Sequence, residues 1–204
     1  MKLNFNISIN PGKVVTEIEN LSKNYGDNMV LSDVNLLIER KSKIAFVGQN
    51  GQGKSTLAKI MVGELTPSSG NSKLGHNVQI GYFAQNQAEY LDGSKTVLQT
   101  MIDSANETNR SKVRDVLGSF LFSGDDVEKY VRVLSGGERN RLALAKLLLQ
   151  PFNVLVMDEP TNHLDFEAIA WLEHRIAAFQ GAVLFITHDR AFLQRLATRI
   201  VEID

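Results

Sequence analysis

A glycine-rich segment that ends in a lysine and two hydroxyl side chains is the clearest chemical signal in this chain of 204 residues. Residues 48–56 read GQNGQGKST and match the phosphate-loop pattern G-x-x-x-x-G-K-[ST]. In such a loop, backbone N–H groups face phosphate oxygens, the lysine reaches the β- and γ-phosphates, and the first hydroxyl ligates Mg²⁺. The pattern therefore predicts a nucleotide site with Ser55 as a metal ligand. The residues expected to bind the nucleotide here are Gly48, Asn50, Gly51, Gly53, Lys54, Ser55 and Thr56.

Two acidic residues follow a second apolar run, at residues 154–157. A carboxylate at the C-terminal end of a strand beside a phosphate loop suits Mg²⁺ coordination, so we expect Asp158 to be a metal ligand. Glu159 is then placed to polarise the water that attacks the γ-phosphate. The plainer alternative, an acidic turn that ends a strand, is disfavoured by the phosphate loop upstream.

A third motif combines a helix cap with two glycines. Ser135 and Glu138 have the S-x-x-E spacing of a capping box, which predicts Ser135 as the N-cap of the next helix. Gly136 and Gly137 permit a close backbone approach at that N-terminus, where a helix attracts anions. One chain would then carry two anion-binding helix N-termini.

The elements that must position these motifs alternate along the chain. Strand and helix alternation in the second half predicts an α/β sheet with parallel strands, and the block at about 87–149 is predicted to be a helical subdomain. A passage rich in Ser, Pro, Gly and Asn at residues 66–72 is predicted as turns. Strands are expected at residues 15–21, 30–38, 44–47, 78–83, 154–157, 183–186 and 199–203, and helices at residues 56–62, 136–149, 166–178 and 190–197, with helical periodicity over residues 96–121.

The composition is that of an ordinary globular protein, with 43% hydrophobic and 22% charged residues and a formal net charge of −1. The length predicts one domain over residues 1–204. The absence of a basic excess gives no argument for nucleic-acid binding. There is no cysteine, and no apolar run approaches the ~20 residues of a membrane span. We therefore expect a soluble cytoplasmic protein with no membrane span of its own.

The run LSGGE at residues 134–138 resembles the signature of the ABC ATPase superfamily, and the other elements of that family follow in order over residues 14–204. The resemblance implies that Tyr25 stacks on adenine and that Gln85 contacts Mg²⁺ and water. It also implies that His188 contacts the γ-phosphate, so Lys54, Glu159 and His188 would carry catalysis. Ser135, Gly136 and Gly137 would bind a second nucleotide. The implied cofactors are ATP and Mg²⁺.

Residues 160–165 match the D-loop of the ABC family, and the sequence NHLD within them resembles the D-loop of the ABC-F subfamily. That resemblance implies a P-loop NTPase fold of ABC type, with a mainly parallel core sheet, an N-terminal antiparallel β subdomain and a helical subdomain. ABC-F proteins carry two nucleotide-binding domains in one chain, and the boundaries of this sequence resemble those of the second. The implied partner is a second nucleotide-binding domain, in tandem or as a homodimer.

Three functions are compatible with these residues and resemblances. The first is the ATPase module of a ribosome-associated translation factor, with the ribosome as a candidate partner. The second is the ATP-binding subunit of an ABC transporter, which the D-loop sequence disfavours. The third is a nucleotide sensor or scaffold without hydrolysis, which Glu159 and His188 disfavour.

Overall fold

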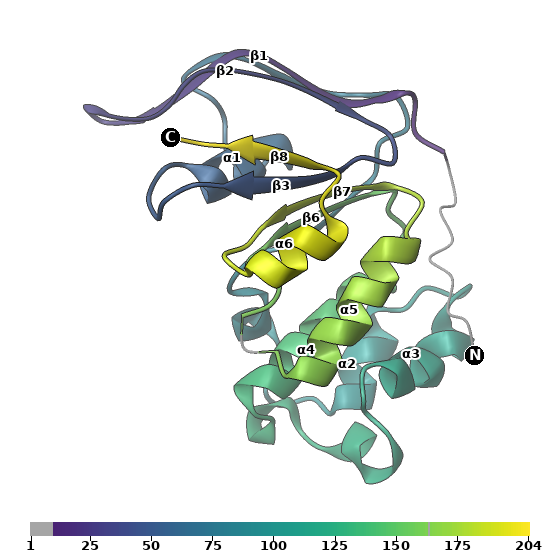
Figure 1. Cartoon of the computed structure of the whole chain (residues 1–204). Helices are drawn as coiled ribbons and strands as arrows, with labels where there is room; N and C mark the ends of the chain where they lie inside the picture. Colours follow the sequence, from purple (N-terminus) through teal and green to yellow (C-terminus); the bar gives the residue numbers. More distant parts are fainter. Residues whose placement is uncertain (1–9, 163) are drawn as a thin grey trace.

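The chain forms a layered α/β structure, shown in Figure 1 as a computed structural model that describes residues 10–162 and 164–204. Short 3₁₀ turns connect several of the elements between β5 and α4. In chain order the strands and α-helices are β1 (Val14–Tyr25), β2 (Asn28–Glu39), β3 (Lys43–Val47), α1 (Lys54–Met61), β4 (Ser69–Leu74), β5 (Ile80–Phe83), α2 (Val97–Ser104), α3 (Val113–Ser119), α4 (Gly136–Leu147), β6 (Val154–Asp158), α5 (Phe166–Ala178), β7 (Ala182–Ile186), α6 (Arg190–Leu196) and β8 (Arg199–Glu202).

Five parallel strands form the central sheet, in the order β5-β6-β7-β3-β8. Strands β6 and β7 are buried along their whole length, which explains why their sequences are short continuous apolar runs. The prediction of central parallel strands at residues 154–157 and 183–186 is confirmed. Since parallel strands end at one edge of the sheet, the loops after β3, β6 and β7 leave it together.

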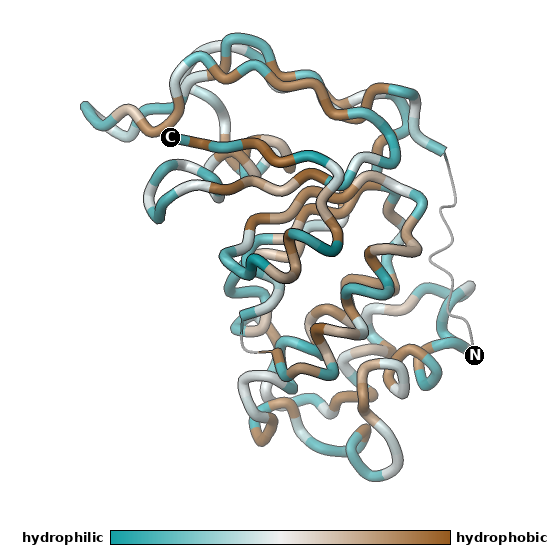
Figure 2. Tube along the Cα trace, in the orientation of Figure 1, coloured by the Kyte–Doolittle hydropathy of each residue, from teal (hydrophilic) through white to brown (hydrophobic). Residues whose placement is uncertain are grey.

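Side chains alternate between two hydrophobic cores on the two faces of this sheet. Leu155, Met157 and Phe185 belong to the core formed with helices α2 to α6. Val156 and Ile186 belong to the other core, formed with α1 and the N-terminal strands. The tube in Figure 2 follows this pattern, with apolar colour along the central strands and hydrophilic colour at the exposed turns. The sheet is thus covered on both faces. The carboxyl ends of its strands are not covered by the described residues, so a site can form there.

An antiparallel sheet of order β2-β1-β4 covers the α1 side. The prediction of turns over residues 66–72 is wrong from Ser69 onward, because residues 69–74 pair with β1 as strand β4. Pairing with a neighbour overrides a weak local preference. Gly70 has φ of +76°, and a Cβ there would lie 2.2 Å from the carbonyl oxygen of Asn20. Only a glycine at this position lets β4 lie this close to β1.

The run predicted as helical over residues 96–121 contains two helices, α2 and α3, with a break at residues 105–109. Asn106 causes the break, because its side-chain oxygen accepts from the N–H groups of Thr108 and Asn109 in place of a helical bond. The apolar residues that give this run its helical periodicity are buried; they include Val97, Met101, Val113, Val116 and Leu117. None of the helices in the described part of the chain combines the length and apolar character needed to cross a membrane.

Candidate active site

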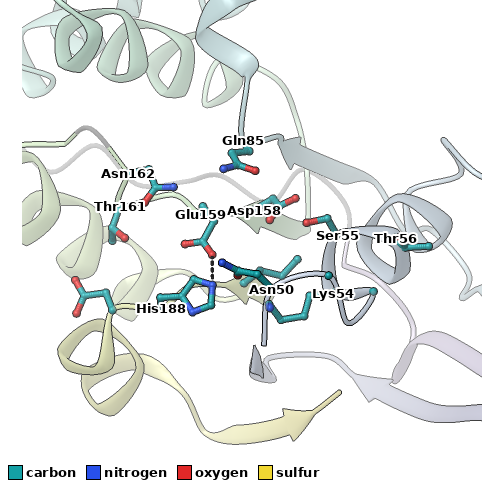
Figure 3. A pocket seen from close by; sticks show the side chains of 14 residues that line it. Asn50, Lys54, Ser55, Thr56, Gln85, Asp158, Glu159, Thr161, Asn162 and His188 are labelled. Carbon is teal, nitrogen blue, oxygen red and sulfur yellow. Dashed lines mark ion pairs between the residues drawn. The ribbon is translucent and has the colours of Figure 1, made fainter. Parts of the chain in front are cut away.

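A cavity of about 560 Å³ opens where the loops after β3, β5, β6 and β7 meet. It brings together residues that are far apart in the sequence, and Figure 3 shows their side chains around one shared space. It is lined by Asn50, Gly51, Gly53, Lys54, Ser55, Thr56, Gln85, Asp158, Glu159, Thr161, Asn162, Ile186, His188 and Asp189. Most of the residues that the sequence indicates for the nucleotide, the metal and catalysis are therefore neighbours.

The glycines at both ends of the β3–α1 loop are required by close contacts. Gly48 has φ of +149°, and a Cβ there would lie 2.1 Å from the carbonyl oxygen of Ile203. Gly53 has φ of +87° and would clash with Val30 and Leu31 of β2. The loop thus packs against β2 on one side and the segment after β8 on the other. This packing holds its backbone in place at the N-terminus of α1.

Lys54 is buried, and its ammonium group lies on the loop itself. Its Nζ donates to the carbonyl oxygens of Gly48 and Gln49, each at 2.8 Å. Gly48, which is outside the lining of the cavity, therefore takes part in the site through its carbonyl group. Because the lysine is the first residue of α1, its charge lies beside the helix N-terminus, and both favour an anion in the cavity.

Asp158 ends strand β6 and is 3% exposed. Burial raises the pKa of its carboxyl group, and a hydrogen bond from Ser55 opposes that rise. Its Oδ1 atom is buried and has no hydrogen-bond partner in the structure. A buried, unpaired carboxylate oxygen beside a hydroxyl group is a fitting pair of ligands for a hard cation such as Mg²⁺.

Gln85 lies on the same wall of the cavity and would add an amide oxygen to that set. Among the residues that the structure describes, no group of three or more His, Cys, Asp or Glu side chains is arranged to hold a metal. A site with so few protein ligands suits Mg²⁺ that is held largely by phosphates and water. When bound there, the ion would neutralise negative charge on the phosphates.

Glu159 and His188 form a pair across the cavity, with 3.3 Å between His188 Nε2 and Glu159 Oε1 (Figure 3). Burial raises the pKa of the Glu159 carboxyl group, and the charge of His188 and a hydrogen bond from the backbone N–H of His188 act in the opposite direction. Glu159 has φ of +51°, a backbone conformation that costs a non-glycine residue about 1–3 kcal/mol. Such strain is typical of a residue whose side-chain position matters.

The capping box at the start of α4 is confirmed. Ser135 Oγ accepts from the N–H of Glu138 at 3.2 Å, and the Glu138 carboxylate accepts from the N–H of Ser135 at 2.7 Å. Gly136 lines a second cavity, which also contains Arg139 and Asn140. The lining of the first cavity includes none of Ser135, Gly136 and Gly137. The N-termini of α1 and α4 therefore border different cavities, whose linings share Gln85 and Asn162.

Tyr25 also lies outside the lining of the first cavity. It ends β1 and is 50% exposed, with Lys23 Nζ 5.3 Å from the centre of its ring. The turn that follows it lies on the same side of the molecule as the β3–α1 loop (Figure 1). An exposed aromatic face at that place can stack on a planar base.

Sequence reasoning did not single out Ile186 and Asp189, which also line the cavity, and it assigned Thr161 and Asn162 only as part of a matched segment. One signal for Asp189 was available in the sequence: it directly follows His188 and precedes the helix predicted at residues 190–197. Asp189 does cap α6, because its carboxylate accepts from the N–H of Phe192 at 3.0 Å. His163, within the segment matched to the D-loop, lies outside the described residues.

The profile of the protein family described as ABC transporter matches residues 31–162, which include the phosphate loop, the signature run and Asp158 to Asn162. The chain belongs to the ABC ATPase family. Its similarity to the ABC-F subfamily also extends over nearly the whole sequence. The protein named ABC transporter F family member 5 of Arabidopsis thaliana is 42% identical, over 100% of this chain and 30% of its own length.

A second relative, ATP-binding protein Uup of Haemophilus influenzae, is 43% identical over 97% of this chain and 31% of its own length. This ABC domain therefore spans about a third of the length of the curated relatives that it matches. A solved structure described as an ATP binding subunit of an ABC transporter superposes with a TM-score of 0.81, over 93% of this chain and 85% of that one. With 23% identity, it confirms the α/β P-loop fold of ABC type.

Proposed function

We propose that this chain is an ABC-F nucleotide-binding domain that hydrolyses ATP with Mg²⁺, as the ATPase module of a ribosome-associated translation factor. Residues 1–204 would form that domain, with a helical subdomain at about 87–149 that carries the signature. Lys54 and the loop N–H groups would bind the phosphates, and Ser55, Asp158 and Gln85 would hold Mg²⁺. Tyr25 would stack on the adenine.

The observation that carries the hydrolytic role is the pairing of Glu159 with His188 in the cavity that also holds Lys54 and Asp158. A carboxylate that takes part in hydrolysis must lie within reach of a water at the γ-phosphate, with a second group to orient that phosphate. A sensor without hydrolysis needs neither group. The geometry supports an ATPase over a passive binding domain.

A second nucleotide-binding domain is part of this proposal. Ser135 and the two following glycines form the N-terminus of α4, and Gly136 there lines a cavity other than the one containing Lys54. They would bind the nucleotide of a partner domain, while their counterparts in the partner would bind the nucleotide held here. Tandem linkage gives an effective concentration on the order of millimolar, whereas separate chains must meet by diffusion.

The experiment that tests the ATPase is turnover measured with Mg²⁺ and ATP over a roughly hundredfold range of protein concentration. Specific activity is expected to fall on dilution, because paired domains separate. Turnover that stays absent at the highest concentration would contradict hydrolysis, and a specific activity that is flat on dilution would contradict pairing. The Glu159→Gln variant supplies the background rate.

Association with ribosomes is the finer part of the proposal, and it rests on the similarity to ABC-F proteins over almost all of the chain. The competing role is the ATP-binding subunit of a transporter. Fractionation of cells that express the gene in its natural context separates the two: the protein should sediment with ribosomes when ATP hydrolysis is blocked by Glu159→Gln. Recovery with membranes instead would favour the transporter role.

A further inference from the structure

Two threonine side chains join the loops that carry Glu159 and His188. Thr161 Oγ1 and Thr187 Oγ1 lie 3.3 Å apart, and Thr187 is 2% exposed. Thr187 Oγ1 also accepts from the backbone N–H of Asp189 at 3.1 Å. A hydroxyl group can donate one hydrogen bond and accept two, so Thr187 can make both bonds at once. The two bonds hold the chain on either side of His188.

The loop that carries Thr161 is itself attached to helix α4. Asn140, which is buried, donates from Nδ2 to the carbonyl oxygen of Asn162 at 3.1 Å. Arg141 forms an ion pair with Asp165, whose other carboxylate oxygen caps α5 by accepting from the N–H of Ala168 at 2.8 Å. The hydroxyl group of Thr161 is therefore presented from a segment that α4 and α5 hold in place.

The imidazole of His188 lacks comparable support of its own. Its side chain is 54% exposed, whereas that of Glu159 is 11% exposed. A half-exposed ring is restrained little by packing, so its position depends mainly on where the backbone places it. This backbone is held by the hydroxyl group of Thr187 and the capping carboxylate of Asp189, and the N–H of His188 itself donates to the Glu159 carboxylate.

We propose that Thr187 is a positioning residue: its hydroxyl group, bonded to Thr161 and to the N–H of Asp189, sets the backbone of His188 so that the imidazole reaches Glu159. Thr187 does not line the cavity and touches no reacting group. The inference rests on the proposed ATP hydrolysis, since the His188–Glu159 pair serves that reaction. It assigns the residue before the histidine a role in turnover without a role in ATP binding.

The first test replaces the hydroxyl group by a methyl group of the same shape, in Thr187→Val. We expect kcat to fall by roughly 10- to 100-fold with KM for ATP little changed, because misplacing a reacting group by about 1 Å can cost that much while the phosphate loop is untouched. Thr187→Ser keeps both hydrogen bonds and should keep most of the turnover. Thr161→Val loses only the bond between the loops and should give a smaller loss of kcat.

A matched control is Thr100→Val in helix α2. Thr100 is also buried, at 5% exposure, and its hydroxyl group donates to the carbonyl oxygen of Thr96 at 2.9 Å. Its replacement should lower stability by an amount similar to that of Thr187→Val and leave kcat unchanged. A loss of kcat in Thr100→Val equal to that in Thr187→Val would reduce the effect to general destabilisation and overturn the proposal.

A double-mutant cycle tests whether Thr187 acts through His188. In a His188→Ala background, Thr187→Val should change kcat by less than about twofold, since no imidazole is left to misplace. Multiplicative losses would contradict the proposal. If Thr187→Val does not fold, Thr161→Val takes its place in the cycle.

An NMR comparison without nucleotide separates this inference from the proposed function. The ring resonances of His188, assigned with His188→Gln, should move in Thr187→Val and stay in place in Thr187→Ser. If the unaltered chain hydrolyses no ATP, the proposed function fails while these spectra still decide whether Thr187 positions the ring. Unmoved resonances in Thr187→Val would overturn the inference even in an active ATPase.

Discussion

The backbone N–H of Glu159 donates to the carbonyl oxygen of Ile186 at 2.9 Å. This bond joins the ends of β6 and β7 at the point where both loops enter the cavity. Glu159 then adopts its positive φ, and its own carbonyl oxygen accepts from the N–H of Asn162 at 3.2 Å. The central sheet and the turn that follows it thereby fix the backbone that carries the carboxylate.

Glu159→Gln should slow hydrolysis by roughly 10²- to 10⁴-fold while ATP affinity is preserved, because an amide cannot take a proton from water. The variant should also accumulate a closed dimer in ATP, which light scattering coupled to gel filtration would detect. Glu167→Gln, an exposed change in the first turn of α5, is the matched control. A Glu159→Gln variant that dimerises no better than the parent in ATP would refute the role given to Glu159.

Lys54→Ala should weaken ATP binding itself by roughly ten- to hundredfold, as expected for the loss of a charged hydrogen bond. Calorimetric titration with ATP measures this directly. Lys59→Ala removes the same charge from an exposed position on the same helix and should keep the affinity. Equal affinity losses in both variants would indicate a general effect of charge instead of a phosphate contact.

The acid limb of the pH–rate profile should lie above the ordinary glutamate pKa of 4.5, because burial raises the pKa of Glu159 and only its carboxylate form assists hydrolysis. His188→Ala removes a charge that lowers this pKa and keeps the backbone N–H that also lowers it, so the limb should move to higher pH in that variant. A limb that stays in place, measured as kcat/KM against pH, would argue that another group controls the rate.

The same raised pKa predicts a pH dependence of stability. The folded chain holds the Glu159 proton more tightly than the unfolded chain does, so this residue makes the free energy of unfolding fall as pH rises from the unfolded pKa through the folded one. Urea titrations of the parent and of Glu159→Gln across that window should show a steeper fall in the parent, because the buried Asp158 contributes equally to both proteins. An identical slope in both would contradict the shift.

Ser135→Ala should lower the free energy of unfolding by about 1 kcal/mol, because it removes the side-chain half of the α4 capping box. Glu138→Ala removes the other half and is the matched control for stability. Only the serine variant should also weaken dimer formation in ATP, since the hydroxyl group of Ser135 is the one proposed to meet a partner's nucleotide. If both variants dimerise equally well, the role of Ser135 is limited to capping α4.

Local patterns predicted the buried parts of the fold well. Residues 166–178 are helical as predicted. The apolar runs that become β6 and β7 are buried on both faces of the sheet, as their continuous hydrophobic sequence requires. Strand β4 was missed because Ser69 and Gly70 are typical turn residues, and only their pairing with β1 makes them a strand. The paired residues lie 47 to 58 positions apart in the sequence, beyond the reach of a local pattern.

Within the site, residues with a distinctive type and spacing were found from the sequence, as Lys54 and Asp158 illustrate. Thr187 was not found, because a threonine after a buried strand has no distinctive pattern. Its contact with Thr161 depends on β6 and β7 being neighbours, which the order of strands in the sheet decides. The residues that hold a site in shape are thus harder to predict than those that define its chemistry.

The two carbonyl groups that hold the Lys54 ammonium group have a consequence for how a nucleotide enters. The oxygens of Gly48 and Gln49 accept two of the three N–H groups of the ammonium group, which leaves one donor for a phosphate oxygen. The buried cation therefore has partners before any phosphate arrives. The loop's own carbonyl groups would hold the lysine in place whenever the site is empty.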